Sequence, residues 1–126
     1  MNDLQEALAG FWARFAPAYL MGHVPDGARF PYITFEAARP DALGQAFLAA
    51  WVWCRMEPGG DVLGERARLM DRIARAIPPS GLRLPAGDGF ILLERNPSGF
   101  QTLLPDPVDP SVIGGRIGYT IRFYHL

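Results

Sequence analysis

The spacing of apolar residues along this chain predicts two helices. The first is expected to begin after Asn2 or Asp3, either of which can cap it, and to end before Pro17. The second is expected to begin after Asp61 and to end at the pair Pro78-Pro79, because a residue that precedes proline is disfavoured in a helix. The apolar residues at helical spacing are Leu4, Leu8, Phe11 and Phe15 in the first helix, and Leu63, Met70, Ile73 and Ile77 in the second.

Between the helices, apolar and polar residues alternate with a period of two, which is typical of half-buried strands. A turn at 24–27 (VPDG) leads into a strand that is expected to run from Phe30 to about Arg39. Pro31 lacks a backbone donor and therefore belongs at the start or on the edge of a sheet. A second strand is expected from about Ala46 to Met56.

After the second helix the pattern predicts only strands and turns. Phe90–Arg95 and Phe100–Leu104 flank the stretch 96–99 (NPSG), which favours a hairpin. A loop rich in proline and aspartate, Pro105–Gly115, is expected to lead into a last strand, Arg116–Leu126. The pattern does not decide whether a further short strand forms around residues 82–84.

These elements predict an α+β fold with the order α-β-β-α-β-β-β. Short links between neighbouring strands favour a mostly antiparallel sheet of about five strands, with both helices packed on one face. A chain of 126 residues is close to the commonest domain size, so we expect a single domain over residues 1–126.

The two sides of the expected strands differ in composition. Ile117, Tyr119 and Ile121 alternate with polar residues on the last strand, and Leu48, Ala50 and Val52 share one side of the second strand. Two small helices cannot cover both faces of such a sheet. If they cover the aliphatic face, the uncovered face carries Tyr32, Trp51, Trp53, Arg55, Arg122 and Tyr124.

A face of tryptophan, tyrosine and arginine has the composition of a protein interface. We therefore predict that these six residues form a subunit interface. The alternative is that the face curls over, so that loops or the last residues bury the tryptophans within one subunit.

Composition and charge exclude several classes of protein. A net charge of −1 argues against a protein that mainly grips nucleic-acid phosphates. One cysteine cannot form an intramolecular disulfide. There is no apolar leader typical of secretion, and the longest apolar run, Ala46–Cys54, is too short to cross a membrane as a helix. We expect a soluble protein that does not bind membranes.

The sequence offers little for catalysis. Cys54 could formally pair with His23 or His125, but its place on the aliphatic side of a strand favours a buried, inert thiol. Asp26, Asp106 and Asp109 do not have the spacing of a calcium loop, and aspartate beside proline is usual in turns. We therefore expect no enzyme, no cofactor and no metal.

The second helix also carries four arginines, which could bind nucleic acid or form a solvated face with partial charge pairing; the second interpretation is favoured. These residues are Arg66, Arg68, Arg72 and Arg75.

Four stretches together resemble the tail terminator and tail completion proteins of long-tailed bacteriophages, a group close to head-tail joining and minor capsid proteins. They are the turn at 24–27 (VPDG), the strand at 30–34 (FPYIT), the strand end at 52–55 (VWCR) and the closing strand at 115–124 (GRIGYTIRFY). The helix between them, with ERA at 65–67 and IARAI at 73–77, also fits this pattern.

The resemblance implies a structural protein of the virion, at the tail or the head-tail junction, that is present in the host cytoplasm during assembly. Such proteins form a ring, commonly a hexamer, which stops the growth of the tail tube and meets the head-completion proteins. The resemblance also implies a ring through which DNA can pass without specific binding. The loop with Asp106 and Asp109 would then be an axial or partner-facing surface, whose charge would repel the passing duplex.

Three other functions stay open at this point. One is a small α+β interaction module unrelated to tails. A ligand-binding protein or enzyme would require a deep pocket that holds Cys54 or a histidine. Binding of single-stranded nucleic acid on the aromatic face would show a steep dependence on salt.

Overall fold

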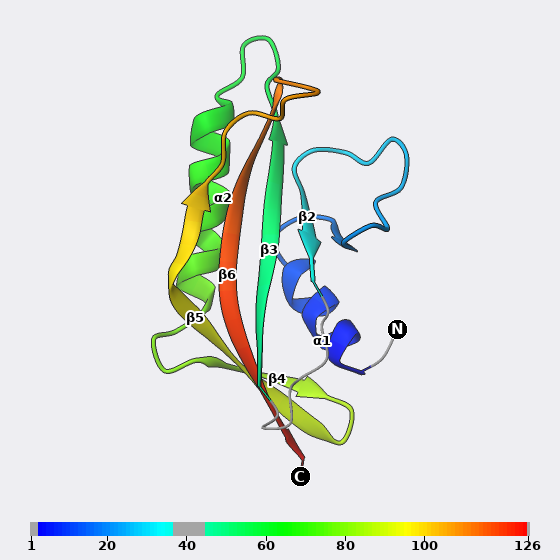
Figure 1. Cartoon of the computed structure of the whole chain (residues 1–126), viewed down its shortest axis with the longest axis vertical. Helices are drawn as coiled ribbons and strands as arrows, with labels where there is room; N and C mark the ends of the chain where they lie inside the picture. Colours follow the sequence, from blue (N-terminus) through cyan, green and yellow to red (C-terminus); the bar gives the residue numbers. More distant parts are fainter. Residues whose placement is uncertain (1–2, 37–44, 126) are drawn as a thin grey trace.

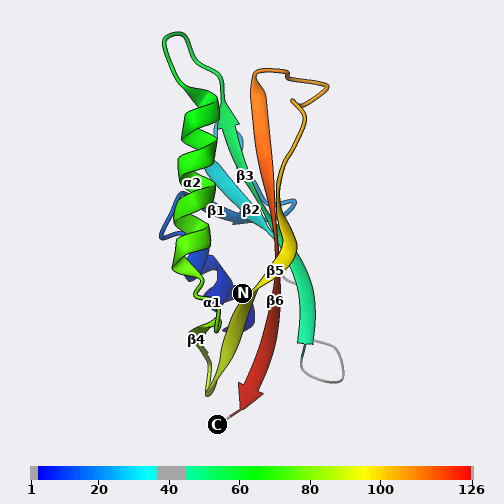
Figure 2. The same cartoon turned by 90° about the vertical axis from the view of Figure 1, so that its left-hand side faces the viewer.

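The computed structural model describes residues 3–36 and 45–125. Helices α1 (Asp3–Trp12) and α2 (Val62–Ala76) lie on the same face of a six-stranded sheet, which curls around them (Figures 1 and 2). The strands are β1 (Ala18–Leu20), β2 (Tyr32–Phe35), β3 (Gln45–Arg55), β4 (Leu82–Ala86), β5 (Gly89–Thr102) and β6 (Val112–His125). The predicted α+β class, with both helices on one face, is confirmed.

The sheet has the order β1-β2-β3-β6-β5-β4, and every neighbouring pair is antiparallel except β1 and β2. The observed order is α-β-β-β-α-β-β-β, with six strands rather than about five: β1 was not predicted, β4 was left undecided, and the two strands expected at 90–95 and 100–104 are the single strand β5. Three residues are too few for an alternating pattern, which is why the sequence did not indicate β1. The short strand around 82–84, which the sequence pattern did not decide, is present as β4 and extends to Ala86.

The predicted hairpin around residues 96–99 is wrong. The chain continues along β6 through this stretch, so that Arg95 pairs with Tyr119 and Phe100 with Ile117, and the surplus residues form a bulge. A bulge accommodates such a surplus without reversing the strand. Gly99 allows the close approach, because a Cβ at this position would lie 2.4 Å from the carbonyl oxygen of Gly118.

The ends of other elements also differ from the prediction. Helix α1 ends at Trp12, earlier than Pro17, and the last strand begins at Val112 rather than Arg116. Strand β2 begins at Tyr32, directly after Pro31 and two residues later than expected, and ends at Phe35. The rest of the predicted first strand, 37–39, and the connection at 40–44 lie outside the described residues.

Helix α2 begins as predicted, because the Asp61 side chain accepts a hydrogen bond from the Gly64 amide at 3.1 Å. It ends at Ala76, before the two prolines. Leu63 does not belong to the core: its side chain is 61% exposed, whereas Val62 and Leu69 are buried.

The core lies between the helices and the concave face of the sheet. Its largest fully buried side chains come from α1, from the residues Ile73 and Ile77 in and just after α2, and from the central strands. Trp12, which the helical spacing did not single out, is fully buried and makes an edge contact with the Tyr119 ring at 5.4 Å between centroids. The two aromatic rings therefore join α1 to β6.

Candidate functional site: the open face of the sheet

The face of the sheet opposite the helices, called here the open face, carries the side chains that alternate with the core residues. The register places Tyr32 beside Trp53 and Thr34 beside Trp51, while Ile33, Phe35 and Val52 point to the helices. No helix covers this side in Figure 2. The sequence therefore predicted correctly which alternate side chains of β3 and β6 face the helices and which face away from them.

Four of the six predicted residues lie together near the end of β3 and form what we call the upper cluster: Tyr32, Trp51, Trp53 and Arg55. The Trp53 indole nitrogen donates a hydrogen bond to the Thr34 hydroxyl at 3.0 Å. The Arg55 guanidinium lies 4.3 Å from the centroid of the Phe30 ring. Partial burial raises the pKa of Tyr32, and Arg55 opposes that effect.

The two tryptophans are half-buried in the single chain. Trp53 packs over Gly114, where an added Cβ would come within 2.8 Å of the indole ring. The face does not curl over them, since the sheet curls toward the helices (Figure 2). Each tryptophan thus keeps part of its surface accessible to a partner.

The other two predicted residues lie away from the upper cluster. Trp51 is opposite Arg116, whereas Arg122 is opposite Gln45, six residues along β3 or about 20 Å at the rise of a strand. Arg122 forms an ion pair with Glu94 at 3.5 Å. The Tyr124 ring stacks on Phe90 with centroids 4.9 Å apart. The structure therefore separates the predicted interface into two groups.

Phe47 lies between these groups and was not among the predicted site residues. It is opposite Thr120 on β6, and its side chain is 70% exposed. Phe47 is an even number of residues from Trp51 and Trp53 and therefore lies on the same side of the strand, which could have identified it. An exposed phenylalanine between two aromatic groups extends the apolar surface along most of β3.

The loop at 103–111 lies at the end of the sheet where β3 ends and β6 begins (Figure 1). Asp106 accepts hydrogen bonds from the amides of Val108, at 2.7 Å, and Asp109, at 3.2 Å. Asp109 accepts from the Ser111 hydroxyl at 2.6 Å and pairs with Arg55 at 3.3 Å. Ser111, more than Arg55, lowers the pKa of Asp109.

Both aspartates of this loop therefore organise their own turn, and Asp109 also joins the loop to the upper cluster. The loop also presents two apolar side chains to solvent: Leu104 is 90% exposed and Val108 is 92% exposed. The sequence showed the acidic residues of the loop but not the exposure of these two residues.

Cys54 lies on the core side of β3, fully buried beside Val62 and Ile113. Burial raises the pKa of its thiol to about 11, so the thiol is protonated at neutral pH and a poor nucleophile. His23 lies exposed in the turn after β1, and the side chain of His125 lies outside the described part of the chain. This arrangement fits the expected inert thiol.

The arginines of α2 are engaged within the chain. Arg66 donates a hydrogen bond to the carbonyl oxygen of Gly114 at 3.2 Å, and Arg75 pairs with Asp71 one turn away. Arg68 lies 3.9 Å from Asp61, and Arg72 lies over the Phe15 ring. These contacts fit a solvated, partly paired helix face.

Within residues 3–36 and 45–125, no helix is long and apolar enough to cross a membrane. The same residues contain no group of three or more histidine, cysteine or acidic side chains that could hold a metal ion.

Comparisons of the chain with known protein families, with curated proteins and with solved structures gave no match.

Proposed function

We propose that this protein is a structural subunit of a long-tailed phage or prophage. It caps the tail tube, as a ring of identical copies, and joins the tube to the head-completion proteins without catalysis. The sequence resemblance supports this assignment at the turn 24–27, in β2, at the end of β3 and along β6.

The observation that carries the proposal is the open face. A sheet with helices on one side only leaves Phe47 and Tyr124 exposed and both tryptophans half-covered, which is an unusual surface for a protein that acts alone. Aromatic side chains and arginine are the residues that contribute most to binding at interfaces. A surface of this kind suits assembly, and it requires no active site.

The loop 103–111 gives a second contact surface at one end of the molecule (Figure 1). Its hydrogen bonds hold the backbone while Leu104 and Val108 face solvent, so docking would cost little ordering of the chain. We assign this loop to the tube protein or the head-completion protein, with Asp106 and Asp109 in a structural role.

The test is the length of tails assembled without this protein. If tail genes lie on both sides of its gene, deletion should give overlong tubes by negative-stain electron microscopy. Expression of the protein in trans should restore a uniform length. Uniform tails in the deletion strain, or a gene neighbourhood without tail genes, would contradict the proposal and favour an interaction module of another kind.

A further inference from the structure

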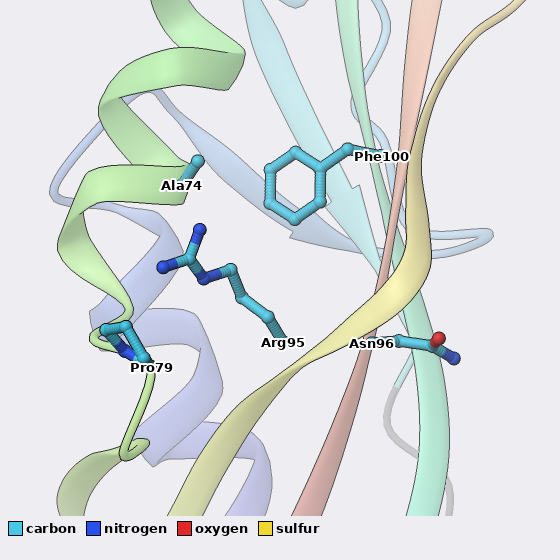
Figure 3. Close-up of a pocket in the computed structure, with 5 residues that line it drawn as sticks. All are labelled: Ala74, Pro79, Arg95, Asn96 and Phe100. Carbon is cyan, nitrogen blue, oxygen red and sulfur yellow. The ribbon is translucent and has the colours of Figure 1, made fainter.

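A pocket of about 470 Å³ lies between the C-terminal half of α2 and β5 (Figure 3). Ala74, Pro79 and Phe100 give it an apolar lining, and Arg95 and Asn96 complete it. In Figure 3, the Arg95 and Phe100 side chains point from β5 toward α2, while Asn96 points away. The pocket thus combines apolar walls with one guanidinium.

The bulge in β5 explains this combination. Arg95 pairs with Tyr119 and Phe100 with Ile117, so both residues have the parity of the helix-facing side. Helix α2 ends at Ala76, and Pro79, shortly after it, lines the pocket together with Ala74 opposite β5. The ion pairs among the described residues do not include Arg95, so the pocket contains a cation without an anionic partner.

The opposite edge of the sheet carries a complementary feature. The segment between β1 and β2 projects from that edge in Figure 1, and it contains the turn 24–27. The Ala28 amide donates to the carbonyl oxygen of Pro25 at 3.2 Å, and Gly27 has φ of 76°, so the turn is well formed. Asp26 is exposed, and none of the ion pairs among the described residues involves it.

We propose that the turn 24–27 of one copy docks in the β5–α2 pocket of a second copy. The Asp26 carboxylate then pairs with the Arg95 guanidinium, and Pro25 lies against the apolar wall formed by Phe100. This inference rests on the proposed function, because it specifies one contact between copies in the ring, in addition to the contacts proposed for the open face.

The positions of the two surfaces favour a second copy as the occupant. Strand β1 is the first in the sheet order, and β4 covers β5 only over Gly89–Leu93, so the turn and the pocket lie at opposite edges. A contact between two different surfaces of one chain repeats from copy to copy and closes a ring when the rotation allows it. The bulge disturbs the β5 ladder, which favours docking by side chains over addition of a strand.

The test uses reversal of each charge. Arg95→Glu alone and Asp26→Arg alone should each weaken self-association on the order of tenfold or more, because like charges then meet at the contact. The double variant should recover association, since the pair is restored with opposite polarity. Arg68→Glu makes the same charge change on α2, outside the pocket, and should leave association unchanged. Sedimentation velocity over a range of protein concentrations gives the association constants.

Both residues are exposed, so thermal unfolding of the single variants should match the wild type. If a reversal disturbs the fold, Arg95→Gln and Asp26→Asn replace it in the same comparison. Wild-type protein that stays monomeric at every concentration overturns the inference. So does unchanged association of the Arg95 variant, or failure of the double variant to recover. Tail length in the deletion strain decides the proposed function separately.

Discussion

Cys54 shows how the position of a residue decides its chemistry. Its thiol is fully buried between β3, α2 and β6, and burial raises its pKa from the ordinary value of 9.0 to about 11. The folded state therefore holds the neutral thiol in a pH range where the unfolded chain begins to ionise it. Alternation along β3 was enough to predict this side of the strand from the sequence.

This difference in pKa predicts a pH-dependent contribution to stability. The contribution of Cys54 is fully present below about pH 9 and is lost as the pH rises toward 11, at a slope that approaches about 1.4 kcal/mol per pH unit. The difference in the free energy of unfolding between wild type and Cys54→Ala should therefore decrease between about pH 8 and pH 10.5. Its slope should approach about 1.4 kcal/mol per pH unit at the upper end of this range. Urea unfolding at several pH values measures it. Parallel pH profiles for the two proteins would contradict the assignment.

For Asp106 and Asp109 the sequence predicted the kind of segment but not the contacts of the side chains. Their charge and the neighbouring prolines indicated a loop, and the structure has one at 103–111. The pattern did not reveal that both carboxylates accept hydrogen bonds inside that loop, because such bonds depend on the three-dimensional path of the chain. The exposure of Leu104 and Val108 follows from the same path.

At the scale of elements, the long bulged strand β5 differs most from expectation. Residues 96–99 contain the amino acids typical of a hairpin turn, but pairing along the whole of β6 competes with that local preference. Gly99 lies so close to Gly118 that a Cβ on Gly99 would come within 2.4 Å of the Gly118 carbonyl oxygen, so only glycine fits at position 99. The strand is thus determined by its neighbour, which a local pattern cannot show.

The close approach predicts that Gly99→Ala destabilises the protein by about 1–3 kcal/mol, since the added carbon would overlap the Gly118 carbonyl. Gly10→Ala is the matched control: Gly10 lies in α1, and an added Cβ there meets nothing within 4 Å. That change should stabilise by about 0.5–1 kcal/mol through helix propensity. Chemical denaturation of both variants compares them. Equal effects at the two positions would contradict the tight packing at the bulge.

The remaining elements differ in how well the sequence indicates them. Helix α2 was predictable because Asp61 caps it, its apolar residues recur at helical spacing and prolines follow it. Strand β1 was not, because three residues carry no period and its parallel partner, β2, begins twelve residues after β1 ends. The candidate interface was predicted as one patch because parity gives the face of a strand but not the distance along it. The register separates Arg122 from Trp51.

At the scale of the whole molecule, the helices and the open face divide the surface into two kinds. The helix layer presents charged residues that pair within the chain, such as Arg75 with Asp71 and Arg68 with Asp61. The open face presents aromatic side chains, with Phe47 the most exposed of those on its strands. If the chain works by assembly, a charge placed on the open face should therefore matter more than a charge placed on the helix layer.

Phe47→Glu and Leu63→Glu test this difference. Both side chains are large, apolar and exposed, at 70% and 61%, but Phe47 lies on the open face and Leu63 on α2. Neither change should shift the free energy of unfolding by more than about 0.5 kcal/mol, because neither residue is buried. Phe47→Glu should fail to restore uniform tails in the deletion strain, because assembly would bury the new charge without a partner. Leu63→Glu should restore them. Equal complementation by both variants would show that the open face stays exposed in the assembled particle.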